Sequence, residues 1–177
     1  MKKLLIHTCC APCLIAPYLK IKDDYDITAL WANGNIHPYT EYKNRLDTVR
    51  EYTITENINY IENDEYGLTD FVQKSAYREE KRCYHCYFDR LDYTAKKAKE
   101  KQYDFFSTSL LYSKFQNHDL IKEIGLAVAK RHQIEFYYED FRELWKKGIE
   151  LSKQKKMYRQ QYCGCVYSEY LRYNVGK

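Results

Sequence analysis

Seven cysteines gather in three short clusters along this 177-residue chain, at positions 9, 10, 13, 83, 86, 163 and 165. A secreted disulfide scaffold usually spreads its cysteines through a short chain, and an odd number argues against a purely disulfide framework. Clustered cysteines in a cytosolic chain are more typical of metal binding or redox chemistry. The spacing therefore indicates a metal or redox site; the alternative is a set of structural zinc ligands with spare buried thiols.

The first two clusters together supply four thiolates. Cys9 and Cys10 follow a predicted strand, where a turn into a helix would let them converge, and a helix N-terminus favours the thiolate form. Cys83 and Cys86 form a C-x-x-C pair, whose turn brings two sulfurs to one metal. Four thiolates suit a [4Fe–4S] cluster or a structural zinc ion equally well. Cys13 remains outside this set, as a buried thiol, a ligand of a second metal or a substitute for one of the four.

The third cluster, Cys163-Gly164-Cys165, is better suited to a disulfide than to tetrahedral zinc. Gly164 permits the tight backbone that a small ring requires. A strained disulfide of this kind is easily reduced. A second redox unit beside a metal site favours iron–sulfur chemistry over inert zinc. The alternative is that Cys163 or Cys165 is an additional metal ligand.

The elements that must position these thiols alternate between strands and helices. Short apolar runs predict strands, and apolar residues that recur every three or four positions predict helices. The expected strands are 2–8, 25–32, 58–61, 104–110 and 134–138. The expected helices are 12–20, 38–55, 68–80, 87–98, 120–128 and a basic helix at 141–157. This alternation predicts an α/β fold with a mostly parallel sheet flanked by helices.

Polar or reactive residues follow three strands of the predicted sheet. They are Cys9-Cys10, the segment 31–35 and the segment 107–109. Because ligands of such sheets bind at the carboxyl ends of the strands, we expect these groups to share one edge. Asn35 and His37 are the candidate substrate contacts of the loop there. His37 suits a general acid, and equally a helix cap or a core residue.

Basic residues concentrate just before the last cysteine pair. Between positions 141 and 160 there are seven lysines and arginines against two glutamates, although the net charge of the whole chain is only +4. Such a segment suits a polyanionic substrate, or it is a solvated helix face. The candidates for nucleic-acid backbone contacts are Lys146, Lys147, Lys153, Lys155, Lys156 and Arg159.

Two features of the chain bear on its location. No apolar stretch approaches the ~20 residues of a membrane span. The N-terminal apolar run ends at His7, which is too early for a signal peptide. We therefore expect a cytoplasmic protein with no membrane partner.

Six segments, in order along nearly the whole chain, match the pattern of one known family. They are 7–13 (HTCCAPC), 33–38 (NGNIHP), 82–87 (RCYHCY), 106–111 (FSTSLL), 140–142 (DFR) and 159–165 (RQQYCGC). In these segments the chain resembles the cobalamin-independent epoxyqueuosine reductases, the QueH family. It departs from the family pattern at Gly34 and Lys114, where proline is usual. Both changes alter the local stiffness of the backbone, and neither removes a thiol.

The resemblance implies the last step of queuosine synthesis. An epoxide on the modified base at the tRNA wobble position is reduced to an alkene, and the oxygen leaves as water. The implied fold is a single HUP-like (Rossmann-like) domain over residues 1–177, which includes the basic C-terminal helical segment of about 141–177. The implied partners are tRNA that carries epoxyqueuosine and an electron donor that the sequence does not identify.

The resemblance also implies roles for individual cysteines. By position, the ligands of a [4Fe–4S] cluster would be Cys9, Cys10, Cys83 and Cys86. Cys163 and Cys165 would form the redox-active disulfide. An additional mononuclear iron beside the cluster is a further option, with Cys13 as a ligand.

Three other functions explain part of the sequence. A zinc-stabilised RNA-binding module accounts for four thiolates and the basic segment, but it leaves Cys163 and Cys165 without a role. A thiol–disulfide oxidoreductase that acts on proteins accounts for the C-x-x-C pair, but not for the adjacent Cys9 and Cys10. A tRNA-thiolating enzyme would need a glycine-rich pyrophosphate loop after the first strand, and the chain has Cys-Cys-Ala-Pro there.

Overall fold

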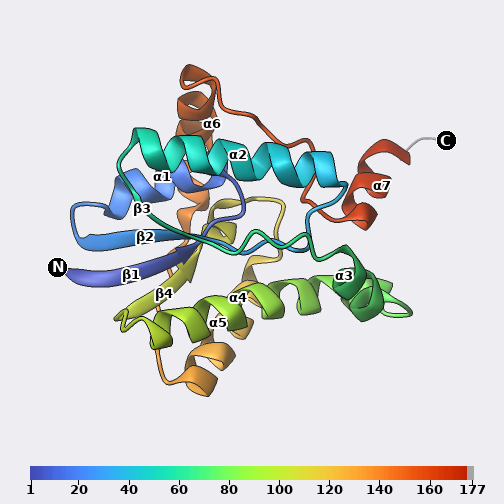
Figure 1. The fold of residues 1–177 in the computed structure, drawn as a ribbon, viewed down its shortest axis with the longest axis horizontal. Helices are drawn as coiled ribbons and strands as arrows, with labels where there is room; N and C mark the ends of the chain where they lie inside the picture. Colours follow the sequence, from blue (N-terminus) through green and yellow to red (C-terminus); the bar gives the residue numbers. More distant parts are fainter. Residues whose placement is uncertain (175–177) are drawn as a thin grey trace.

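The computed structural model of the chain describes residues 1–174 and shows one parallel sheet between two layers of helices (Figure 1). The strands are β1 (Lys2–His7), β2 (Tyr25–Trp31), β3 (Asn59–Glu62), β4 (Phe105–Thr108) and β5 (Glu135–Phe136). They pair in parallel in the order β3-β2-β1-β4-β5. The predicted α/β class with a parallel sheet is thereby confirmed.

The central strand β1 is buried on both faces of the sheet. Its residues Leu4, Leu5 and Ile6 are fully buried, and Leu4 lies opposite Ile27 of β2 and Phe105 of β4. A continuous apolar run is what a parallel strand covered by helices on both faces requires. The core of the molecule therefore surrounds the strand that leads into Cys9.

The helices are α1 (Ala11–Ile21), α2 (Tyr39–Thr55), α3 (Leu68–Ser75), α4 (Arg82–Glu100), α5 (His118–His132), α6 (Trp145–Gln154) and α7 (Val166–Asn174). Three short 3-10 segments accompany them: Glu79–Lys81, Ser109–Tyr112 and Phe141–Leu144. In Figure 1, α1, α2 and α6 lie on one side of the sheet, and α4 and α5 lie on the other. Within residues 1–174, no helix is both long and apolar enough to cross a lipid bilayer.

The strand order reverses beside β1. The chain moves from β1 to β2 and β3 on one side, and then returns to β4 and β5 on the other. In parallel α/β sheets, a crevice for ligands opens at the carboxyl edge where the order reverses. Cys9 lies two residues after the end of β1, so the topology places it at this point.

Three of the predicted helices differ from the observed ones in ways that bear on the cysteines and the basic segment. The predicted helix 87–98 begins earlier, at Arg82, so Cys83 and Cys86 lie in the first turn of α4. The predicted helix 68–80 ends at Ser75, because Tyr77 has a left-handed backbone with φ of 58°. The predicted basic helix 141–157 starts as a 3-10 segment and ends at Gln154, shortly before left-handed Lys156 (φ 53°). The C-terminal segment is therefore not one continuous helix.

Candidate functional site

Hydrogen bonds between side chains tie the carboxyl ends of β1, β2 and β4 together. Nδ1 of the buried His7 lies 2.9 Å from Thr108 Oγ1, and Nε2 lies 3.0 Å from Asn33 Oδ1. Because Asn33 Nδ2 donates to the carbonyl of Thr8 at 2.9 Å, Asn33 Oδ1 accepts and His7 carries its proton on Nε2. Burial and the charge of Arg90 lower the pKa of His7 to about 4, so the ring is neutral. The three predicted groups thus share one edge.

Cys9 and Cys10 occupy the turn from β1 into α1. The hydroxyl oxygen of Ser109 accepts from the Cys9 N–H at 3.0 Å, and the same hydroxyl lies 3.4 Å from Cys9 Sγ. Cys10 has an extended backbone (φ −171°, ψ 159°), and Ala11 begins the helix. This change of backbone lets adjacent side chains face the same space, and the two sulfurs lie 3.9 Å apart. The local turn that the sequence required is present.

Cys13 joins these two residues to form the inner triad, our name for Cys9, Cys10 and Cys13. The three sulfurs are buried and lie within 4.8 Å of one another. Cys13 lies three residues after Cys10, a spacing that puts side chains on one side of a helical turn. The sequence left Cys13 outside the set of four thiolates, whereas the structure places it beside Cys9 and Cys10.

The three thiols of the inner triad differ in the direction in which their pKa values are shifted. Hydrogen bonds with Cys10 and Cys13 hold the pKa of the Cys9 thiol well below its usual range. Burial raises the pKa of Cys10, and the hydrogen bond with Cys10 raises the pKa of Cys13. Cys9 is therefore the first thiol to ionise. Closely spaced sulfur donors of this kind fit zinc, iron or an iron–sulfur cluster.

Cys83 and Cys86 lie on α4, three positions apart, so both side chains project from the same side of its first turn. Cys83 is exposed and Cys86 is partly buried. Burial raises the pKa of Cys86 to about 12, against the opposing charge of Arg90. Among the described side chains, the inner triad is the one group of three metal-binding residue types whose ligand atoms lie within 4.8 Å. The set of four cysteine ligands that includes Cys83 and Cys86 stays a prediction.

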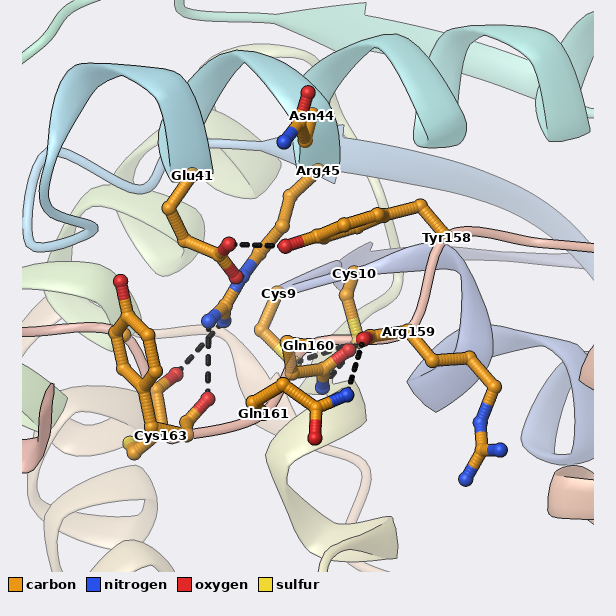
Figure 2. A network of polar contacts seen from close by, with 12 residues as sticks. Cys9, Cys10, Glu41, Asn44, Arg45, Tyr158, Arg159, Gln160, Gln161 and Cys163 are labelled. Atoms are coloured by element: carbon orange, nitrogen blue, oxygen red, sulfur yellow. Dashed lines mark hydrogen bonds and ion pairs between the residues drawn. The ribbon is translucent and has the colours of Figure 1, made fainter. Parts of the chain in front are cut away.

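The segment 157–165, which we call the C-terminal strap, lies against the inner triad (Figure 2). The side-chain amide of Gln160 donates to Cys10 Sγ at 3.0 Å and to Cys13 Sγ at 3.4 Å. The backbone N–H of His37 donates to the carbonyl of Gly164 at 2.7 Å. Gly164 has a φ of +153°, where a side chain would be strained. A glycine between the last two cysteines is therefore a requirement of the backbone.

A buried ion pair anchors the strap to α2. Arg45 is 1% exposed, and its Nε donates to Glu41 Oε1 at 2.6 Å. Its Nη1 and Nη2 donate to the carbonyls of Cys163 at 2.8 Å and Tyr162 at 3.0 Å. The hydroxyl of Tyr158 donates to the other carboxylate oxygen of Glu41. Figure 2 shows the guanidinium between the carboxylate and these two carbonyls.

The last cysteine pair lies beside α4. Gln116 Nε2 donates to Cys163 Sγ at 3.1 Å, and the hydroxyl of Tyr87 on α4 donates to Gln116 Oε1 at 2.7 Å. Cys163 is exposed and Cys165 is buried, and both are free thiols. The charges of Cys163 and Cys165 also contribute to the raised pKa of Cys86, after burial. Gln116 thus links Cys163 to the helix that carries Cys83 and Cys86, and the redox pair stays a prediction.

A cavity of about 360 Å³ opens beside Cys86, between α3, α4 and the loop after β2. Its polar lining includes Asn35, Asn63, Asp70, Arg82, Asp89 and Arg90. Asn35 is 7% exposed, and its Oδ1 has no hydrogen-bond partner among the described residues. His37 is fully buried instead, and its ring packs on Phe71 at 4.9 Å between centroids. Of the two predicted contacts in this loop, only Asn35 lines the cavity.

The predicted basic contacts differ in their surroundings. Lys153, Lys156 and Arg159 are exposed, as are Lys146 and Lys147. Lys155 forms an ion pair with Glu56 at 2.5 Å. The exposed side chains are thus available to a polyanion, whereas Lys155 already has an anionic partner.

Several residues of the site were not singled out from the sequence. Arg45 and Arg90 both occupy the buried face of a helix, next to apolar residues such as Leu46 and Leu91. A charged residue at an apolar position of a helical pattern was the available signal. Gln160 lies in the matching segment 159–165, but a glutamine three residues before a cysteine carries no signal of its own.

A parallel sheet with a buried thiol triad at its carboxyl edge defines a class of α/β protein equipped for a soft metal or redox centre. A family model described as "Epoxyqueuosine reductase QueH" matches residues 4–170. The chain therefore belongs to the epoxyqueuosine reductase QueH family, which is a family of oxidoreductases.

Relatives from several bacteria carry the same name. Epoxyqueuosine reductase QueH of Dehalococcoides mccartyi is 34% identical over 172 residues, which cover 97% of this chain and 94% of that protein. The protein of Thermotoga maritima is 32% identical over 178 residues, which cover 95% and 91%. The protein of Streptococcus pyogenes is 33% identical over 178 residues, which cover 93% and 69%.

Proposed function

We propose that this protein reduces epoxyqueuosine to queuosine at the wobble position of tRNA. The observation that carries the proposal is the inner triad, three buried sulfurs within 4.8 Å at the carboxyl edge of the sheet, in a chain of this family. Opening an epoxide and removing its oxygen requires electrons at carbon, and a thiol-held redox metal supplies them. Because tRNA is its substrate, we also propose that the protein acts in the cytoplasm.

The cofactor that we propose is a [4Fe–4S] cluster held by Cys9, Cys10, Cys83 and Cys86. Once bound, the iron would supply single electrons and a Lewis acid. Cys13 is our proposed ligand for an additional mononuclear iron. Its sulfur lies within 4.8 Å of Cys9 and Cys10, which supports an iron bound close to the cluster.

Cys163 and Cys165 are proposed as the two-electron store. Converting the epoxide to an alkene and water takes two electrons and two protons. Oxidation of two thiols to one disulfide releases two electrons and two protons, so the steps balance. An electron donor, still to be identified, would then reduce the disulfide. If a double variant, Cys163→Ser with Cys165→Ser, still reduced one equivalent of substrate after prereduction, the pair would not be this store.

The tRNA grip that we propose combines charge with stacking. The backbone contacts would come from the exposed residues Lys146, Lys147, Lys153, Lys156 and Arg159, with Lys155 weaker because of its ion pair. Phe115 is 84% exposed, and its ring packs edge-on against Trp145 at 5.5 Å. Its neighbour Gln116 contacts Cys163, so an unpaired base stacked on Phe115 would lie next to the site.

The loop after β2 is proposed to contact the modified base. Asn35 lines the cavity beside Cys86, and its free Oδ1 would accept a hydrogen bond from an N–H or O–H group of the base. His37 would act through its backbone, which holds Gly164 of the strap. Burial lowers the pKa of the His37 ring to about 4, so a protonated ring is not the proposed acid.

The decisive experiment combines colour with product analysis. Anaerobically purified protein should be brown, absorb near ~400 nm and bleach with dithionite. Incubation with epoxyqueuosine tRNA should yield queuosine in nucleoside digests analysed by mass spectrometry. Binding of this tRNA should weaken steeply as salt rises.

Two results would favour the rival functions. A colourless protein with stoichiometric zinc and no conversion of tRNA would support an RNA-binding module. Reduction of protein disulfides without conversion of tRNA would support a thiol–disulfide oxidoreductase.

A further inference from the structure

Arg90 of α4 is a buried cation with an unusual set of partners. It is 5% exposed, and its Nε donates to the carbonyl of Cys86 at 3.0 Å. Its Nη2 donates to Cys86 Sγ at 3.1 Å. In the described part of the chain it forms no ion pair with a carboxylate. The other buried arginine, Arg45, pairs with Glu41 at 2.6 Å.

A guanidinium keeps its proton at any physiological pH, so burial cannot neutralise Arg90. A buried charge without a counter-charge destabilises a fold by several kcal/mol. The sulfur of Cys86 lies beside this cation, at 3.1 Å from Nη2, and it becomes an anion when it binds a metal.

The position of Arg90 also links sulfur to the cavity. Its guanidinium lines the 360 Å³ cavity together with Cys86. Its charge also reaches the sheet edge, where it lowers the pKa of His7 after burial. Arg90 is thus in contact with a cysteine sulfur and also lines the cavity.

We infer that Arg90 is a positioning residue, the fixed counter-ion of the thiolate-held centre, which acts through its N–H···S bond to Cys86. The inference rests on the proposed function for the identity of the centre. A cation and an N–H donor at a ligand sulfur stabilise the more negative, reduced state, so Arg90 raises the reduction potential of the centre. When the thiols are protonated and no metal is bound, the same cation has no anion beside it and destabilises the fold.

The test compares Arg90→Gln and Arg90→Lys with a matched control, Arg131→Gln. Arg131 is an exposed arginine of α5 that pairs with Asp92. We expect Arg90→Gln to shift the reduction potential of the iron-loaded protein to a more negative value in an electron paramagnetic resonance titration. We expect Arg90→Lys to shift it less, and the control to leave it unchanged. Hydrogen-bonded partners of metal ligands typically contribute about 10–100-fold to affinity, so Zn²⁺ binding by Arg90→Gln should weaken within that range.

Thermal unfolding separates this role from a structural one. Metal-free Arg90→Gln should melt at the same temperature as metal-free wild type or higher, because the unbalanced cation is gone. Loading with Zn²⁺ alone should then raise its melting temperature less than it raises that of wild type. A lower melting temperature without metal, with unchanged zinc affinity and potential, would mean that Arg90 only fastens the first turn of α4.

The outcomes also separate this inference from the proposed function. If wild type fails to convert epoxyqueuosine tRNA but its zinc affinity depends on Arg90, the function is wrong and the counter-ion role stands. If wild type converts the tRNA and Arg90→Gln changes neither zinc affinity nor potential, the counter-ion role is wrong. Wild type that binds neither zinc nor iron would also overturn it.

Discussion

The inner triad and the C-terminal pair, Cys163 and Cys165, are held in place in different ways. One local junction between β1 and α1 places the triad, and its sulfurs are buried. The pair lies on a strap without strand or helix, which residues far away in sequence hold by hydrogen bonds, and Cys163 is exposed. A rigid, shielded site suits a resident metal, whereas an accessible thiol suits exchange of electrons with other molecules.

The largest expected effect comes from breaking the triad. Cys9→Ser removes the thiol whose pKa is held lowest, and we expect it to abolish iron binding and lower conversion of epoxyqueuosine tRNA by at least about 100-fold. Cys163→Ser is the matched change in the C-terminal pair, and it should keep the iron. Iron and sulfide per chain, with mass spectrometry of tRNA nucleosides, measure both effects. Equal iron content in Cys9→Ser and Cys163→Ser would contradict the assignment of iron binding to the triad.

A smaller effect is expected where the strap joins α2. Arg45→Met leaves the carboxylate of Glu41 buried without its partner, which should lower the free energy of unfolding by about 3–5 kcal/mol. The control Arg50→Met removes an arginine that is 35% exposed and pairs with Glu62, Asp47 and Asp64, and it should cost less than Arg45→Met because these carboxylates remain in contact with water. Urea unfolding measures both.

Arg45→Met also tests whether the strap depends on its distant anchors. Loss of Arg45 frees the carbonyls of Tyr162 and Cys163, so alkylation of Cys163 should become faster. A second variant, Arg45→Met with Glu41→Leu, removes both charges and should recover most of the stability. If the double variant is as unstable as Arg45→Met alone, the unpaired carboxylate is not the cause.

Sequence reasoning succeeded where structure is local. The strands, their parallel pairing and the shared edge follow from apolar runs and from polar or reactive groups shortly after strands, such as Cys9 and Asn33. The start of α4 was missed because its first turn, Arg82 to Cys86, is polar and hides the helical pattern. Cys13 was left out because spacing alone cannot show which sulfurs of a turn converge.

The strap could not be predicted because its anchors are distant. Arg45 and Cys163 are 118 positions apart, and no local pattern links them. The same holds for Gln160 and Cys10, which are 150 positions apart. Arginines on apolar helix faces were a usable signal, since a buried cation must have an anion near it.

Acid should lower the stability of the protein through His37, whose backbone N–H holds Gly164 of the strap. Burial lowers the pKa of His37 to about 4, against ~6.5 in an unfolded chain. The unfolded state therefore binds more protons at this position between these values, so the contribution of His37 to stability is full above pH 6.5 and falls as the pH drops towards 4, by at most about 3 kcal/mol. His37→Phe should flatten this part of the curve of unfolding free energy against pH. A curve with unchanged slope would assign the acid sensitivity to other groups.

The smallest expected effect comes from replacing Phe115, an exposed aromatic residue next in sequence to Gln116. Phe115 is 84% exposed, packs against Trp145 and directly precedes Gln116, the residue that contacts Cys163, so we do not expect it to hold the triad in place. Stacking of a base on an aromatic ring contributes about 1–3 kcal/mol. Phe115→Ala should therefore raise the KM for epoxyqueuosine tRNA by roughly 5- to 150-fold, with kcat and iron content unchanged.

Two matched variants separate stacking from general loss of apolar surface. Phe115→Trp keeps a ring and should keep the KM of wild type. Tyr77→Ala removes an aromatic ring that is 98% exposed, in the loop between α3 and the 3-10 segment before α4, and it should leave the KM unchanged. If Phe115→Ala lowers iron content or kcat instead of raising KM, Phe115 helps to maintain the metal site. An effect on KM alone shows that substrate recognition and metal retention are separate tasks of the two regions.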